Sequence, residues 1–157
     1  MILHELLPQG AERVMVAAGG TVGAALSFAF GDVGPLLYWL LVFVCFDFAT
    51  GMYAAWQTST WSSKKVFIGV LKKSVIFWIV ALSHGLDMTL QLLLDSWAIF
   101  QSITICAYAA GEFGSIIENL ERAGLGGAVP PVLRRLVKTL DERIEAHAEA
   151  KEEKHHE

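Results

Sequence analysis

Apolar residues dominate four long segments of the chain, and polar or turn-forming residues separate these segments. The first, residues 14–30, has no charge but is rich in Gly and Ala. Residues 36–56 form a second apolar segment with one acid, Asp47. The third and fourth cover about 66–94 and 97–120 and contain several charges. Because roughly 20 helical residues cross the hydrocarbon core of a bilayer, this pattern predicts four transmembrane helices.

The predicted fold class is an all-α integral membrane protein with a C-terminal amphipathic helix in the cytoplasm. Residues 1–13 form a short N-terminal cytoplasmic segment and residues 14–120 the transmembrane domain. Residues 121–157 supply a Gly-rich hinge, the amphipathic helix and a charged tail. The first helix is the weakest span because its Gly and Ala content gives little hydrophobicity. The alternative is a three-span protein whose first helix lies in the membrane interface.

The distribution of Lys and Arg sets the expected orientation through the positive-inside rule. The two loops around Asp32 and Asp95 contain neither residue type. The opposite ends of the predicted spans carry Arg13, Lys64, Lys65, Arg122, Arg134, Arg135 and Lys138. Four spans then place both termini in the cytoplasm, with the protein in the bacterial cytoplasmic (inner) membrane.

Composition agrees with a membrane protein and gives little support to other classes. The chain of 157 residues is 54% hydrophobic and 18% charged, with a net charge of −4. No basic stripe interleaved with aromatics is present, which argues against nucleic acid as a partner. The sequence has no nucleophile–base pattern, phosphate loop or CxxC pair, so we expect no catalytic residue, metal, cofactor or enzyme activity. Cys45 and Cys106 lie in apolar segments and are expected to pack as small residues.

Small residues recur at helical spacing on three predicted helices. Such faces let helices approach closely in lipid, where packing replaces the hydrophobic effect. The pattern fits packing within one chain and equally an interface between subunits of a homo-oligomer. The residues are Gly19, Gly23, Ser27 and Gly31, then Gly51 and Ala55, and then Ala107, Gly111 and Ser115.

Ionisable residues within the predicted spans are costly in hydrocarbon, so they usually pair or face a wet cavity. On the predicted topology Asp47 and Lys72 both lie within about 10–14 Å of the cytoplasmic end of their helices. Acidic residues of the fourth helix lie on the same side. We therefore expect a buried polar network of Asp47, Lys72, Lys73, Glu112 and Glu118. Such a network either fixes helix register or lines a wet surface after assembly. His84 and Asp87 supply too few ligands for a metal site. They are expected to contribute to the polarity of the nearby loop on the side of the membrane opposite the cytoplasm.

The expected C-terminal helix carries an apolar stripe of Leu133, Val137, Leu140 and Ile144. Its spacings of four, three and four put these residues on one face. The stripe is suited to the membrane surface, with basic residues beside it, or to a bundle of identical helices.

Four sequence motifs, in this order, resemble the toxin-secretion and phage-lysis holin family (phage holin family 4). They are DFATGMYAAW at 47–56, SSKKVFIGVLKK at 62–73, AGEFGSIIENLERAG at 110–124 and VPPVLRRLVKTL at 129–140. The positions that match the motif of the family are Asp47, Thr50, Gly51, Ser63, Lys64, Gly69, Lys72, Lys73, Glu112, Ser115, Glu118, Asn119 and Pro130. The N-terminal span and the acidic tail have no counterpart in this pattern.

The resemblance implies a protein that oligomerises in the cytoplasmic membrane and permeabilises it. An endolysin, or a large toxin in some hosts, then leaves the cytoplasm without necessarily contacting the protein directly. The main alternative is a small proton- or cation-coupled transporter or selective channel, in which Asp47 or Glu112 would bind the ion. A non-conducting scaffold that recruits a partner through its last helix is a third interpretation.

Overall fold

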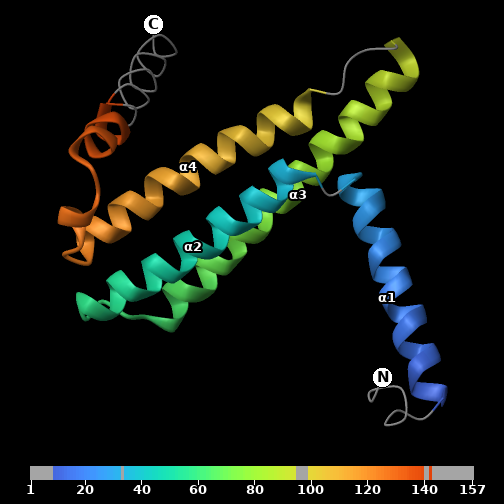
Figure 1. Ribbon diagram of the computed structural model, residues 1–157, viewed down its shortest axis with the longest axis horizontal. Helices are drawn as coiled ribbons and strands as arrows, with labels where there is room; N and C mark the ends of the chain where they lie inside the picture. Colours follow the sequence, from blue (N-terminus) through green and yellow to red (C-terminus); the bar gives the residue numbers. More distant parts are fainter. Residues whose placement is uncertain (1–8, 33, 95–98, 140–141, 143–157) are drawn as a thin grey trace, which may run out of the picture. The chain divides into compact units, whose positions relative to one another are not determined.

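The computed structural model describes residues 9–32, 34–94, 99–139 and 142. Within these residues the fold is all-helical, without strands, as Figure 1 shows. The elements are α1 (Gln9–Phe30), α2 (Pro35–Gln57), α3 (Ser63–Leu94), α4 (Phe100–Arg122) and the 3-10 turn η1 (Gly126–Ala128). A further helical segment follows η1 at residues 131–139.

Three of these helices are long and apolar enough to cross a membrane. By length and composition the candidate spans are Arg13–Phe30, Pro35–Gln57 and Ser63–Leu94. The first helix, which we expected to be the weakest span, is among them. Among the described helices α4 is the long one that is not a candidate span, because polar residues along it, such as Gln101 and Glu112, lower its hydropathy. Four membrane crossings therefore stay a prediction, and α4 is the helix on which it depends.

Two of the helix ends require glycine. Gly31 follows α1 with φ of 69°, and Gly124 follows α4 with φ of 77°. At the second position the Leu125 amide donates to the Leu120 carbonyl over 2.9 Å, and the Gly124 amide donates to Glu121 over 3.0 Å. This pair of bonds is the Schellman motif, which needs a left-handed residue and so favours glycine. It ends α4 and turns the chain toward η1.

The chain divides into two compact units. One contains Met1–Leu40 with Lys72–Ala107, and the other contains Leu41–Leu71 with Tyr108–Glu157. Buried side chains of the first unit are Leu40, Ile76, Val80, Asp87 and Ile105. Those of the second are Val44, Asp47, Ala54, Glu112, Ile117, Asn119, Val129 and Val137.

The buried positions of each long helix follow helical periodicity. On α3 the buried residues Ile76, Val80 and Asp87 are four and seven apart, so they form one stripe. Most other apolar side chains of the candidate spans are exposed, including Phe28 at 80% and Trp78 at 73%. Exposed apolar surface on helices of this length is expected to face lipid or another membrane protein.

Candidate functional site: the α2–α4 clamp

Asp47 of α2 and Asn119 of α4 form a buried polar contact within one compact unit. Asn119 donates a hydrogen bond from Nδ2 to Oδ1 of Asp47 over 2.9 Å. The same nitrogen lies 3.4 Å from the backbone carbonyl oxygen of Asp47. Both residues are 7% exposed. Because a buried carboxylate needs hydrogen-bond donors, this contact explains how α2 carries an acid within an apolar segment.

Thr50 lies one turn after Asp47 and extends the contact. Its hydroxyl donates to backbone carbonyls of its own helix, 2.9 Å from the oxygen of Phe46 and 3.0 Å from that of Asp47. The hydroxyl oxygen lies 3.4 Å from Nδ2 of Asn119. A threonine that donates to its own helix keeps its oxygen lone pairs for an acceptor role. Thr50 therefore presents an oxygen to Asn119 without leaving its own proton unsatisfied.

Gly51 makes room for the Asn119 amide. A Cβ atom built on Gly51 would lie 3.3 Å from Nδ2 of Asn119 and 3.8 Å from its Cγ. Any larger residue would press against the group that bonds Asp47. We call Asp47, Thr50, Gly51 and Asn119 the α2–α4 clamp. Its two halves are 72 positions apart in the chain, measured between Asp47 and Asn119.

Glu112 is the second buried acid of this unit, at 6% exposure. It precedes Asn119 by seven residues, which is two helical turns, so both side chains lie on the same face of α4. Ser115, between them in sequence, is half-buried. The buried face of α4 therefore carries two polar residues, Glu112 and Asn119, two helical turns apart.

The five residues of the expected polar network occupy different environments. Asp47 and Glu112 are buried, Lys73 is half-buried, and Lys72 and Glu118 are exposed. Asp47 accepts a hydrogen bond from Asn119, a residue that the expected network did not include. A network that joins all five residues stays a prediction. The exposed sides of Lys72 and Glu118 are expected to contact lipid headgroups, water or another subunit.

The expected small-residue faces also differ from one another. Gly19, Gly23 and Gly111 have open space around the position of a Cβ atom, and Ser27 and Ala107 are exposed. In contrast, Gly31 and Gly51 contact other parts of the chain, and Ala55 and Ser115 are half-buried. The small residues at open positions are those that remain available for contacts outside the described chain.

The other motif residues lie at the start of helices or on their exposed sides. Ser63 and Lys64 open α3, and Gly69 has open space around it. Pro130 directly precedes the helical residues 131–139, and its carbonyl accepts the Leu133 amide over 3.0 Å. Proline at the beginning of a helix loses no hydrogen bond there. Ser63, Lys64 and Pro130 therefore shape the first turns of two helical segments.

The described part of the C-terminal stripe packs against α4. Val137 is 8% exposed and forms a core cluster with Ile117 and Val129, and Leu133 is packed against that cluster. Leu140 and Ile144 lie outside the described residues. The first half of the stripe is thus covered by the protein's own helix, so neither the membrane nor a second copy is needed to cover Leu133 and Val137.

A polar contact in the other compact unit involves Asp87, which the sequence placed near the end of the third predicted helix and interpreted as part of the polarity around the following loop. Asp87 of α3 is 3% exposed and accepts three backbone hydrogen bonds at the start of α4. Oδ1 lies 3.1 Å from the amide of Ile99 and 2.9 Å from that of Phe100, and Oδ2 lies 2.8 Å from that of Gln101. Asp87 is therefore a helix cap supplied from a neighbouring helix. In the sequence, the single carboxylate within this apolar segment is the feature that could have indicated the cap.

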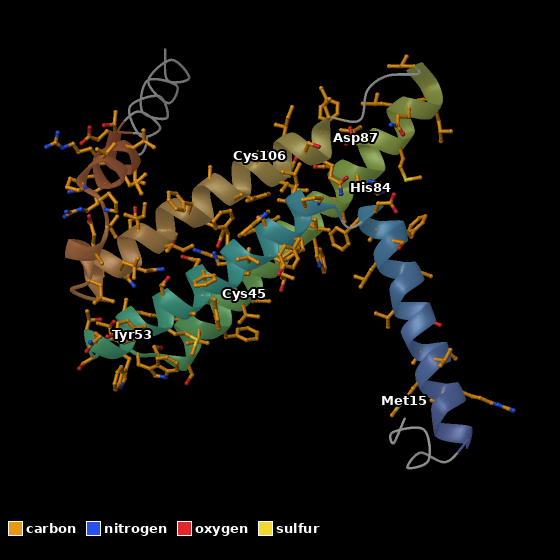
Figure 2. All side chains as sticks on the ribbon, viewed as in Figure 1. Met15, Cys45, Tyr53, His84, Asp87 and Cys106 are labelled. Atoms are coloured by element: carbon orange, nitrogen blue, oxygen red, sulfur yellow. The ribbon has the colours of Figure 1, made fainter. Side chains whose placement is uncertain are left out.

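The same unit ties the end of α1 to α3 and α4. Gln101 donates from Nε2 to the Phe30 carbonyl over 2.8 Å, and this oxygen belongs to the last residue of α1. A Cβ built on Gly31 would lie 2.6 Å from Cε1 of His84. Figure 2 labels His84 and Asp87 on α3, near the start of α4 and the end of α1. We call Gly31, His84, Asp87 and Gln101 the α1–α3–α4 junction.

The contacts at these two sites are suited to holding helices together. Within the described residues no group of three or more His, Cys, Asp or Glu is placed to hold a metal ion. Buried polar contacts between helices in lipid contribute about 0.6 kcal/mol on average and up to about 1.7 kcal/mol. Their directionality also fixes the rotation of one helix against its neighbour, which apolar contacts alone do less strictly.

Comparison with known proteins identifies the family. The model of the bacteriophage holin family matches residues 24–142, which include the clamp and the junction. An uncharacterised protein of Listeria innocua is 35% identical over 85% of this chain and 88% of its own length. An uncharacterised protein of Halalkalibacterium halodurans is 32% identical over 82% of this chain and 95% of its own. A protein of Bacillus phage phi105 named a probable holin is 29% identical over 69% and 76%. No solved structure matches. The chain belongs to the bacteriophage holin family.

Proposed function

We propose that this protein oligomerises in the bacterial cytoplasmic membrane and permeabilises it, so that an endolysin or another large protein leaves the cytoplasm. Membership of the holin family supports this proposal, as does the similarity to a probable phage holin. We further propose four membrane crossings with both termini in the cytoplasm. On that topology the clamp lies in the cytoplasmic half of the membrane and the junction lies near its outer face.

The observation that carries the proposal is the large apolar surface that each chain leaves uncovered. The described chain buries 0% of the candidate span in α1, 17% of that in α2 and 11% of that in α3. Such surfaces are available for contacts with lipid and with further copies of the chain. A helix is about 10–12 Å across with its side chains, so a hole wide enough for a folded enzyme needs helices from many chains.

The clamp gives each subunit of such an assembly a defined shape. Asn119 donates a hydrogen bond to Asp47 within the chain, and no second subunit is required for this bond. α2 and α4 are thereby held in one rotational setting before subunits meet. In the alternative transporter, Asp47 would have to exchange Asn119 for an ion during each transport cycle. The hydrogen bond does not favour that role, so we propose no ion site.

The proposal is tested by inducible expression in bacteria with a co-expressed cytoplasmic endolysin. The readouts are a potential-sensitive dye, culture turbidity and the activity of endolysin outside the cytoplasm. We expect abrupt loss of membrane potential followed by lysis that requires the endolysin. A strain that expresses a catalytically inactive endolysin serves as the control and should depolarise without lysing.

Two results would count against this function. Normal membrane potential despite accumulation of the protein in the membrane would exclude permeabilisation and favour a scaffold. Depolarisation that releases small ions but never the endolysin would instead favour a selective channel.

A further inference from the structure

The helical residues 131–139 turn back alongside the last part of α4. Val137 packs with Ile117, and its Cγ1 atom would lie 3.7 Å from a Cβ built on Gly114. Gly114 precedes the end of α4 at Arg122 by eight residues, which is about 12 Å along the helix axis. Figure 1 shows the chain turning after α4, through η1, into this segment. The segment is therefore level with the final turns of α4 rather than beyond them.

This packing fixes which side of the segment faces outward. Leu133 and Val137 pack against the core cluster, so the side chains of Val132 and Leu136 lie on another face and are 74% and 55% exposed. These two apolar residues are four apart and so form a pair one turn long. Arg135 and Lys138 are both exposed. Arg135 lies one turn from Val132, and Lys138 lies one turn further along from Arg135. The segment thus has a second apolar strip, with basic residues on one side of it, that nothing in the described chain covers.

Basic residues gather in the stretch that follows α4. Residues 122–139 contain Arg122, Arg134, Arg135 and Lys138 and no acidic residue, and Glu121, Asp141 and Glu142 flank this stretch. Arg134 turns toward α4, where its Nε atom lies 3.9 Å from Oε1 of Glu121. Arg122, Arg135 and Lys138 are exposed. A short apolar strip bordered by basic side chains matches the headgroup region of a leaflet that contains anionic lipids.

We propose that the exposed face of residues 131–139, formed by Val132, Arg135, Leu136 and Lys138, docks on anionic phospholipid headgroups of the cytoplasmic leaflet. The apolar pair inserts at the level of the upper acyl chains, and the basic pair contacts phosphate groups. The position beside α4 supports this occupant, because a segment level with the end of a membrane helix already lies at the bilayer surface. The inference rests on the proposed topology, in which α4 crosses the membrane with its C-terminal end in the cytoplasm.

A second copy of the chain is a poorer occupant for this face. Identical copies would bring Arg135 and Lys138 close to their own equivalents, and like charges repel. Two exposed apolar side chains also offer far less area than the roughly 1,200 Å² that stable protein interfaces usually bury. A leaflet of anionic lipid has the complementary charge and needs no matched surface.

The test places an environment-sensitive fluorophore on the exposed strip of the full-length chain. Cys45 and Cys106 are replaced by Ser, and Leu136→Cys supplies the labelling site. The protein is reconstituted in vesicles of phosphatidylcholine alone or of phosphatidylcholine with phosphatidylglycerol. Lifetimes of the fluorophore, and its quenching by spin-labelled acyl chains, give the ratio of membrane-embedded to water-exposed probe.

We expect this ratio to be higher in the anionic vesicles and to fall with added salt. Arg135→Gln and Lys138→Gln should each lower it by roughly fivefold in anionic vesicles, the effect of one basic residue near such a leaflet, and should change it little in neutral ones. Arg134→Gln is the matched control, because Arg134 is half-buried beside Glu121. That substitution should leave the lipid dependence in place. A second labelling site, Val132→Cys, guards against a local effect of replacing Leu136.

Equal embedding in both kinds of vesicle, or no embedding in either, would overturn the proposal. Disulfide cross-linking between two unlabelled Leu136→Cys chains would show a second copy in contact at this face, which would also overturn it. Because the assay does not measure release of protein, a chain that docks but fails to lyse bacteria would contradict only the proposed holin function.

Discussion

The Nδ2 atom of Asn119 lies 2.9 Å from Oδ1 of Asp47, and this hydrogen bond joins α4 to α2 at a buried position. Two short motifs at distant places in the sequence thus meet at one contact. Of the residues that match the motif of the family, the clamp contains Asp47, Thr50, Gly51 and Asn119. Asp47, Thr50 and Asn119 share hydrogen bonds between or within the two helices, and Gly51 leaves the space that the Asn119 amide occupies.

Removal of either partner should break this hydrogen bond between α2 and α4 and destabilise the fold. We expect a double-mutant cycle of Asp47→Ala and Asn119→Ala to give a coupling free energy of about 0.6–1.7 kcal/mol. The free energy of unfolding is measured in mixed micelles with increasing SDS. The matched control is a cycle of Phe46→Ala and Arg122→Ala, exposed residues of the same helices, whose effects should add. Additive effects at Asp47 and Asn119 would show that the contact is energetically irrelevant.

Alanine substitutions at Gly51 and Gly69 distinguish the effect of helix propensity on the free energy of unfolding from the effect of the clamp. Gly69 has open space around it, so Gly69→Ala should raise the free energy of unfolding by up to about 1 kcal/mol. Gly51→Ala should lack this gain because the new methyl group presses on Asn119 at 3.3 Å. In an Asn119→Ala background the two substitutions should become equivalent in the same unfolding assay. Equal gains in the wild-type background would mean that Asn119 moves aside without cost.

The sequence predicted the helical segments better than the contacts between them, and the reason is physical. Runs of apolar residues bounded by Gly, Pro or polar loops determine where helices lie, and α2, expected at 36–56, runs from Pro35 to Gln57. Which polar residues meet depends on how each helix is rotated, and a single sequence does not specify this. The sequence assigned Asp47 to a network with lysines and glutamates, which stays a prediction, and it did not foresee the hydrogen bond that Asp47 accepts from Asn119. The resemblance to the family had singled out Asn119 without giving it a partner.

The cap that Asp87 provides for α4 should contribute measurably to stability. We expect Asp87→Ala to lower the free energy of unfolding by about 1–2 kcal/mol, since three backbone amides lose their acceptor. Asp87→Asn should have a smaller effect because its amide oxygen still accepts a hydrogen bond. Amide hydrogen exchange at Ile99, Phe100 and Gln101 should accelerate more in the alanine variant than in the asparagine variant.

Thr89→Ala is the control for the cap. Thr89 is exposed, and its hydroxyl donates to the Gly85 carbonyl of its own helix over 2.8 Å. This substitution should leave the exchange of the α4 amides unchanged. If Asp87→Ala also left those amides protected, α4 would begin without help from α3, and the three short distances would have no energetic weight.

The turn after α1 should tolerate change at Gly34 but not at Gly31. Gly31→Ala puts a side chain on a residue with φ of 69°, which costs about 1–2 kcal/mol, and puts its Cβ 2.6 Å from His84. Gly34→Ala meets only the Asp32 carbonyl oxygen at 3.9 Å and should be close to neutral. Adding His84→Ala to Gly31→Ala removes the steric conflict and leaves the backbone cost. The double variant should therefore recover part of the lost free energy of unfolding. Full recovery would assign the whole effect to the histidine ring, and no recovery would assign it to the backbone alone.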